Sequence, residues 1–149
     1  MKKTKIYLDN CCYNRPFDDQ SQIRISLEAQ AKLHIQRCVI NKEYDLLYSY
    51  MSVYENSENP NPERRNSISN FFRYATEYIG INKSDVIETH AESLKKWNIK
   101  SNDAIHLACA MEGKCNYFIT TDDGILKNCY GMDIHVCSPI IFISEVNNA

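Results

Sequence analysis

The sequence predicts an α/β protein, a three-layer α/β/α sandwich around a mainly parallel sheet of about five strands. Short apolar runs typical of buried strands alternate along the chain with amphipathic stretches typical of helices. The 149 residues, of which 44% are hydrophobic and 24% charged, suit a globular protein with a core of its own. We therefore expect a single domain that spans residues 1–149.

Five short runs read as strands, because each is apolar and is bounded by polar or turn-forming residues. They lie at residues 5–9, 45–50, 77–81, 117–121 and 134–138. The run at 77–81 is the weakest of the five, so the segment 59–100 is the least defined part of the prediction.

Six stretches read as helices and lie between these strands. Their ranges are 21–40, 51–60, 62–75, 82–97, 102–112 and a last stretch that begins at Ser138-Pro139. The first of them repeats an apolar residue every four positions, which is typical of a long amphipathic helix. Asn82 and Ser101 have the side chains of helix N-caps, and Gly113 is suited to end the fifth helix. Residues 14–22, which contain Pro16, read as a loop.

Charge and motifs exclude several classes of function. The formal net charge is −2, so the chain does not hold nucleic acid by an overall positive charge. Neither GxxxxGK[ST] nor GxGxxG, the glycine-rich phosphate-binding motifs, is present. No apolar run is long enough to span a bilayer, and too few apolar residues follow the basic start MKKTK for a signal peptide. We therefore expect a cytoplasmic protein with no membrane partner.

The seven cysteines are expected to be reduced thiols. Their number is odd, their spacing is irregular, and no CxxC pair of the kind that binds zinc is present. The adjacent Cys11 and Cys12 are poorly arranged as two ligands of one tetrahedral ion. The favoured interpretation is that the cysteines are small, buried apolar side chains.

Four carboxylates fall where a parallel α/β sheet binds its ligands. Asp9 lies at the carboxyl end of the first predicted strand, and Asp122 lies just past that of the fourth. Glu55 lies in the first turns of the helix after the second strand, and Asp103 begins the helix before the fourth. Ligands of open parallel sheets bind outside the carboxyl ends of the strands, near the point where strand order reverses. If the first and fourth strands are neighbours, Asp9 and Asp122 converge there, while the reach of Glu55 and Asp103 is left open.

Each acid taken alone has an ordinary structural explanation. Asp at a strand end is often a turn or cap residue, Asp103 suits the first turn of a helix, and Glu55 suits a solvated helix face. A shared site is favoured by the apolar neighbours in YLDN and NDAIHLACA and by the absence of a paired basic residue in the sequence. Clustered carboxylates repel each other unless a proton or a cation intervenes. Four hard oxygen donors favour Mg²⁺ or Mn²⁺ over zinc.

The segments IYLDNCCYNRPFDD, SVYEN, SNDAIHLACA and FITTDDGIL resemble, in this order, the four acidic motifs of the PIN-domain family. The resemblance covers nearly the whole chain, and the ordered set is more specific than any one motif. Family members are α/β/α sandwiches related to the 5′-nuclease fold and are typically metal-dependent ribonucleases. Many bacterial members are toxins of toxin–antitoxin pairs. The resemblance therefore implies a Mg²⁺- or Mn²⁺-dependent ribonuclease that leaves a 5′-phosphate and a 3′-hydroxyl, with an antitoxin protein as a partner.

The resemblance also implies roles for individual residues. Thr120, two positions before the last acid of the motif, matches the hydroxyl residue that orients the cluster. Asn10 stands where many relatives have a small hydroxyl residue, so its supporting role is left open. Asp123 lies one residue past the motif position and is not given the role. The residues implied to bind the metal and to act in catalysis are Asp9, Glu55, Asp103 and Asp122.

Two further residues are candidates for the same site. His106 lies one helical turn after Asp103 and could face the carboxylates, but a buried structural histidine is the favoured interpretation because histidine is not a standard ligand of Mg²⁺. Arg15 is the best candidate for a contact with the RNA backbone, because its loop leaves the strand that carries Asp9.

Two other classes of function are weighed against the ribonuclease. A PIN-like module could bind RNA or a protein without cleaving, although the presence of all four acids argues against it. A phosphatase-like enzyme would need a second acid two residues after a nucleophilic Asp9, where the chain has Cys11. The RNA target, the number of metal ions and the oligomeric state, a homodimer included, are left open.

Overall fold

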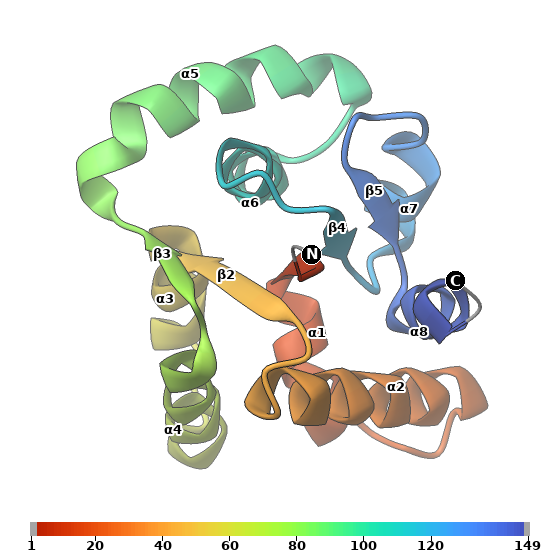
Figure 1. Ribbon diagram of the computed structural model, residues 1–149. Helices are drawn as coiled ribbons and strands as arrows, with labels where there is room; N and C mark the ends of the chain where they lie inside the picture. Colours follow the sequence, from red (N-terminus) through yellow and green to blue (C-terminus); the bar gives the residue numbers. More distant parts are fainter. Residues whose placement is uncertain (1–2, 148–149) are drawn as a thin grey trace.

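The computed structural model describes residues 3–147 and has the predicted three layers, a sheet between two layers of helices (Figure 1). All strand pairs are parallel, and the strand order is β3-β2-β1-β4-β5. The strands are β1 Lys5–Leu8, β2 Asp45–Ser49, β3 Glu77–Ile79, β4 Tyr117–Ile119 and β5 His135–Cys137. Strand β1 therefore lies in the centre, and the chain builds the sheet outward from it in both directions.

Eight α-helices connect and cover these strands in the described part of the chain. They are α1 Asn10–Asn14, α2 Ile23–Ile40, α3 Tyr50–Ser57, α4 Pro62–Phe71, α5 Ser84–Leu94, α6 Ser101–Glu112, α7 Asp123–Asn128 and α8 Pro139–Asn147. Single 3₁₀ turns at Arg15–Phe17, Phe72–Tyr74 and Lys95–Trp97 extend α1, α4 and α5, and one at Ile81–Lys83 precedes α5.

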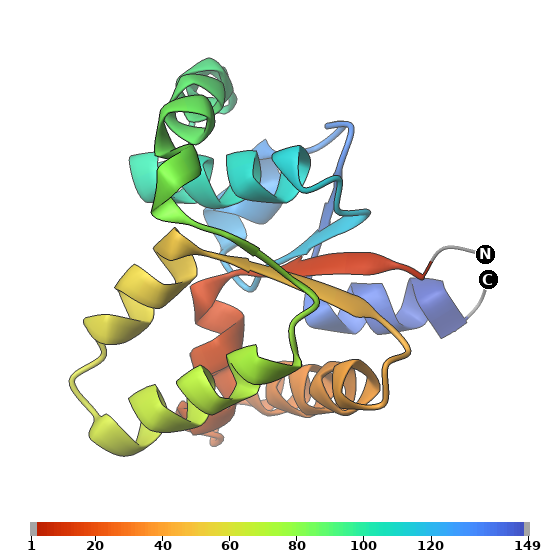
Figure 2. The same ribbon diagram turned by 60° about the vertical axis from the view of Figure 1, so that its left-hand side comes forward.

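The sheet has an apolar core on each face, as side chains alternate along every strand. Tyr7 of β1 points to the face that is covered by α5, α6 and α7. Ile6 and Leu8 point to the opposite face, which is covered by α1, α2, α4 and α8 (Figure 2). Strands buried on both faces explain why the runs in the sequence are almost continuously apolar.

The strand order reverses between β1 and β4, which are direct neighbours. Their register pairs Leu8 with Ile119, so the residues that follow both strands emerge side by side. The predicted convergence of Asp9 and Asp122 required the first and fourth strands to be neighbours, and the structure confirms that they are.

Several predicted helix boundaries are wrong. Asn82 does not cap a helix, because it lies inside a 3₁₀ turn closed by the Lys83 amide on the Gly80 carbonyl at 3.0 Å, and α5 begins after that turn. Ser101 is the first residue of α6 instead of its cap, because the Lys100 carbonyl already accepts from the Ala104 amide.

Two short helices, α1 and α7, were not predicted. Helix α1 ends where the predicted loop 14–22 begins, and the 3₁₀ turn Arg15–Phe17 lies within that loop. Each of the two helices follows its strand within three residues and is capped by an acid, Asp9 for α1 and Asp122 for α7.

The cysteines are free thiols, and six of the seven are buried, in agreement with their predicted role as small apolar side chains. Cys11 is the partly exposed one. Within residues 3–147, no helix has both the length and the apolar character that crossing a membrane requires.

Candidate active site

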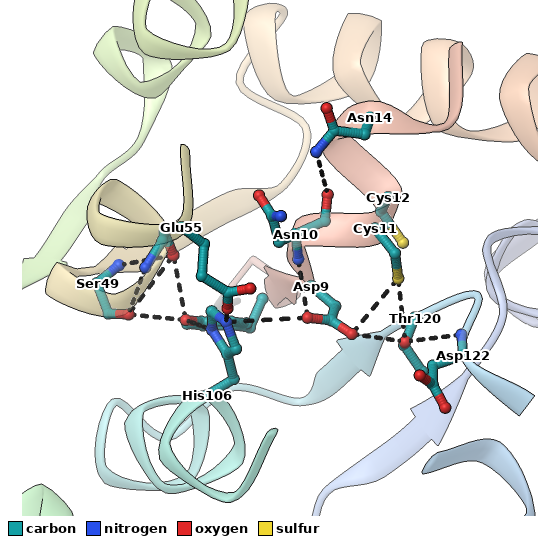
Figure 3. Close-up of polar contacts among 12 residues, drawn as sticks. Asp9, Asn10, Cys11, Cys12, Asn14, Ser49, Glu55, His106, Thr120 and Asp122 are labelled. Carbon is teal, nitrogen blue, oxygen red and sulfur yellow. Dashed lines mark hydrogen bonds and ion pairs between the residues drawn. The ribbon is translucent and has the colours of Figure 1, made fainter. Parts of the chain in front are cut away.

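The carboxyl ends of β1 and β4 bring Asp9 and Asp122 to one place. The Asp9 amide donates to the Ile119 carbonyl at 2.9 Å, which continues the β1–β4 pairing past the strand. The Thr120 hydroxyl donates to Oδ2 of Asp9 at 2.8 Å and accepts from the Asp122 amide at 3.1 Å (Figure 3). One fully buried hydroxyl therefore holds both acidic residues in position.

Asp9 and Asp122 are also the N-caps of the two short helices. Oδ1 of Asp9 accepts from the Asn10 amide at 2.8 Å, and Oδ1 of Asp122 accepts from the Ile125 amide at 3.1 Å. Asn10 thus supports the site through its backbone amide. The second oxygen of Asp122 accepts no hydrogen bond from residues 3–147, so it is available to a ligand.

Glu55 joins this group through His106, a fully buried residue of α6. Nε2 of His106 contacts the Glu55 carboxylate and lies 3.9 Å from Oδ1 of Asp9 (Figure 3). Burial lowers the pKa of His106, but the hydrogen bond with Glu55 and the negative charge of Asp9 outweigh burial and raise the pKa above its ordinary value. His106 is therefore both a buried residue and a neighbour of two of the candidate acids.

The charges of the other three acids affect the pKa of Asp103. Partial burial, then the charges of Asp9 and Asp122 and, more weakly, that of Glu55 raise the pKa of the Asp103 carboxyl to about 6, while His106 opposes this rise. The contributions of Asp9, Asp122 and Glu55 are repulsions between like charges, which disfavour the ionised form of Asp103. The four acids, from four different segments of the chain, therefore share one electrostatic environment at the carboxyl end of the sheet.

The charge balance of this environment suits a divalent cation. Among residues 3–147, neither a lysine nor an arginine forms an ion pair with any of the four acids, and His106 is their one potentially cationic partner. The carboxylate oxygens of the four acids are also spread out. No three of the acids have oxygens that all lie within 4.8 Å of one another. Mg²⁺ fits this spacing, since it usually keeps several of its waters and contacts only one or two carboxylates directly.

The Asp123 carboxylate forms its ion pair outside the group of four acids. The carboxylate is exposed and binds Arg24 of α2, with Oδ1 at 2.7 Å from Nη2. The hydrogen bond with Arg24 lowers the pKa of Asp123, opposite to the shift of Asp103. This arrangement agrees with leaving Asp123 out of the candidate set.

Arg15, the candidate for RNA contact, forms ion pairs with two acids of its own chain. Its Nε lies 3.3 Å from the buried Glu28 carboxylate, and its Nη1 donates to Asp18 at 3.0 Å. The side chain is 17% exposed. A contact between Arg15 and RNA stays a prediction, and the structure adds that Arg15 also balances the charge of Glu28.

Three residues around the site had not been predicted to take part in it. The Tyr7 hydroxyl lies 2.5 Å from Nδ1 of His106 and 2.7 Å from Oγ of Ser49, the N-cap of the helix that carries Glu55. The Cys11 thiol lies 3.4 Å from Oδ2 of Asp9. Tyr7 and Ser49 lie in strand-like runs whose pattern carries no signal for a polar network.

Comparison with known proteins places the fold. No family model matches the chain, and no curated protein matches it. FitAcB from Neisseria gonorrhoeae has a similar structure, with a TM-score of 0.58 and 17% identity over 91% of this chain and 98% of that chain. VapBC2 from Rickettsia felis, solved bound to a DNA fragment from their promoter, gives a TM-score of 0.52 and 13% identity over 89% and 97% of the two chains.

VapBC-1 from nontypeable Haemophilus influenzae gives a TM-score of 0.50 and 16% identity over 92% of this chain and 99% of that chain. The matches thus extend over almost the full length of each neighbour. At these identities the likeness concerns the fold, and it confirms the PIN-like α/β/α architecture that the sequence predicted.

Proposed function

We propose that the protein is a metal-dependent ribonuclease of the PIN type and the toxin of a toxin–antitoxin pair. The observation that carries the proposal is the meeting of four carboxylates at the end of β1 and β4, where the pKa of Asp103 is raised and no lysine or arginine of residues 3–147 pairs with them. The acids are Asp9, Glu55, Asp103 and Asp122. The similarity of the fold to FitAcB, VapBC2 and VapBC-1 is in keeping with the toxin part of the proposal.

The four acids would hold Mg²⁺ or Mn²⁺, which fits their hard oxygen donors. When bound, such ions attract the anionic phosphodiester, lower the pKa of a bound water and stabilise charge on the attacking and leaving oxygens. The residues of the chain set the geometry. Thr120 orients Asp9 and the backbone before Asp122, and His106 keeps the Glu55 carboxylate turned toward Asp9.

A second candidate is a PIN-like module that binds RNA or a protein partner without cleaving. The contact between Glu55 and His106 favours this candidate, because a carboxylate that is bound to an imidazole is less available to a cation. The two candidates share the fold and differ in whether the acids bind an ion that acts on RNA.

Cleavage of a panel of fluorescent single-stranded RNAs in Mg²⁺ or Mn²⁺, with EDTA as the blank, separates the two candidates. For a ribonuclease, Asp9→Asn and Asp122→Asn should each remove most of the metal-dependent cleavage, because each removes one charge from the ion site at nearly constant volume. Asp123→Asn is the matched control, since its carboxylate faces Arg24. If the wild-type protein binds RNA or a partner tightly but never cleaves RNA, the binding module is the correct candidate.

The toxin part of the proposal has a separate readout. Induced expression of the wild-type chain in a bacterial host should arrest growth, whereas Asp9→Asn should not. A short reading frame beside the gene, expressed together with it, should restore growth if it encodes the antitoxin. Cleavage in vitro without growth arrest would point to a ribonuclease that is not a toxin.

A further inference from the structure

A second group of metal-type side chains lies on the edge strand of the sheet. His135 and Cys137 of β5 and Glu145 of α8 each offer one ligand atom, and the three atoms all lie within 4.8 Å of one another. Within residues 3–147, no other three histidine, cysteine or acidic residues have ligand atoms this close to one another. The group belongs neither to the acids at the end of β1 and β4 nor to their supporting residues.

The local structure explains why the three side chains meet. His135 and Cys137 are two residues apart on a strand, so their side chains share one face. Helix α8 follows β5 after one residue and runs back along the sheet (Figure 2). Oε2 of Glu145 lies 3.2 Å from Nδ1 of His135. The donors therefore come from two consecutive elements.

The imidazole is held in place by the neighbouring strand. Tyr117 of β4 is the register partner of His135, and the two rings are stacked with their centroids 5.2 Å apart. His135 is 49% exposed and Glu145 is 39% exposed, whereas Cys137 is buried. The group thus has a buried sulfur beneath two donors that are open to solvent, which allows an ion to enter from outside.

We propose that His135, Cys137 and Glu145 bind a divalent transition ion of the Zn²⁺ class, with the remaining coordination position open to water. A sulfur, an imidazole nitrogen and a carboxylate oxygen form a ligand set that suits Zn²⁺ or Co²⁺ and that Mg²⁺ does not prefer. Tetrahedral Zn²⁺ with bonds of about 2.0–2.3 Å needs donors about 3.5 Å apart, so the atoms need to move by only about 1 Å.

Binding would exchange one proton for the ion. The Cys137 thiol is buried and has to lose its proton to coordinate an ion, because the thiolate is the form that binds metals. The ion takes the place of the thiol proton, which leaves to solvent, and no redox change is involved. An ion held in this way would tie α8 to the edge strand, independently of any ribonuclease activity.

Titration with Co²⁺ under a reductant that does not chelate metals tests the proposal directly. A cobalt–thiolate bond gives a near-ultraviolet charge-transfer band that oxygen ligands do not give, and we expect one equivalent of Co²⁺ to produce it. Zn²⁺ should abolish the band, and millimolar Mg²⁺ should leave it. Cys137→Ser should remove the band, while His135→Gln and Glu145→Gln should weaken Co²⁺ binding by at least about tenfold.

Two control variants locate the band. Cys11→Ser should keep it, although the Cys11 thiol lies beside Asp9 at the carboxylate site. His90→Gln should also keep it, because His90 forms a comparable ion pair with Glu112 at 2.9 Å outside any such three-residue group of the described chain. A band that survives Cys137→Ser or disappears in Cys11→Ser would overturn the proposal, as would folded wild-type protein that gives no band. If Cys137→Ser does not fold, the exposed-site variants His135→Gln and Glu145→Gln decide, and unchanged Co²⁺ affinity in both would refute the site.

Discussion

Nε2 of His106 on α6 contacts the carboxylate of Glu55 on α3. The contact joins the two helices through residues that are 51 positions apart in sequence. The other ring nitrogen lies 2.5 Å from the Tyr7 hydroxyl, which belongs to the central strand. Both polar atoms of a fully buried ring therefore have partners. The buried structural histidine that the sequence favoured is also the residue that brings Glu55 to the other acids.

Replacing His106 by Gln should impair both stability and metal use. Removing one partner of a buried network leaves the others unsatisfied and typically costs about 1–3 kcal/mol of unfolding free energy. If His106 positions Glu55, the variant should also need more Mn²⁺ for half-maximal cleavage. Urea unfolding and Mn²⁺-dependence of cleavage measure the two effects, with His90→Gln as the control. A loss of stability with an unchanged Mn²⁺ requirement would leave His106 a purely structural role.

Asp103 should destabilise the metal-free protein near neutral pH. Its pKa is about 6 in the folded state and is raised above the ordinary value, so between about pH 4 and 6 the folded protein binds more protons than the unfolded chain. The free energy of unfolding therefore falls as pH rises through this window. In EDTA, Asp103→Asn should raise the melting temperature at pH 7.5 by about 2–4 °C and change it little at pH 4.

Asp123→Asn gives the contrast for this experiment, because binding to Arg24 lowers the pKa of Asp123. Its ionised form is favoured by folding, so the variant should melt at the same or a lower temperature at pH 7.5. If both variants melted higher by equal amounts, general relief of surface charge would explain the result, and repulsion at the site would not.

Thr120 should act through its hydroxyl and not through its shape. Thr120→Val keeps the volume but removes the donor to Asp9 and the acceptor of the Asp122 amide, both in a buried position. We expect a loss of about 1–3 kcal/mol in unfolding free energy and a clear loss of cleavage. Thr120→Ser restores the hydroxyl and should recover most of the cleavage rate. Equal activity of the two variants would show that the bridging hydroxyl is dispensable.

Lys32, a buried residue of α2, should limit the stability of the fold. Burial lowers the pKa of its amine to about 8, although Nζ lies 5.0 Å above the Phe71 ring and donates to Gln36. Between about pH 8 and 10 the unfolded chain binds the proton that the folded protein has lost, so the free energy of unfolding rises with pH there.

Lys32→Met should accordingly stabilise the protein by about 1–2 kcal/mol at pH 7, after allowance for the lost cation–π contact. The advantage over wild type should shrink as pH rises from about 8 to 10. Chemical unfolding at several pH values measures it, with the exposed Lys96→Met as the control. An advantage that does not change with pH would attribute the gain to packing.

The predicted strands and long helices agree with the structure where local sequence decides them. The apolar run before Asp9 and the four-residue repeat of α2 record burial directly, and both elements form within two residues of the expected bounds. The caps at Asn82 and Ser101 were placed wrongly, because turn geometry in the preceding residues decided where each helix began. Acids at strand ends were read as turn or cap residues or as ligands, and Asp9 and Asp122 do cap helices.

The sequence by itself determined the alternation of strands and helices, the parallel sheet and the position of Asp9 and Asp122 at strand ends, because each follows from the spacing of apolar residues and from turn chemistry. The tertiary structure alone decided that His106 lies between Glu55 and Asp9, that the charges of the other three acids act on Asp103, and that Glu145 meets His135 and Cys137. Those contacts depend on how far helices lie from strands and how they are rotated. Side-chain packing sets these quantities, and a local pattern of apolar and polar residues does not encode them.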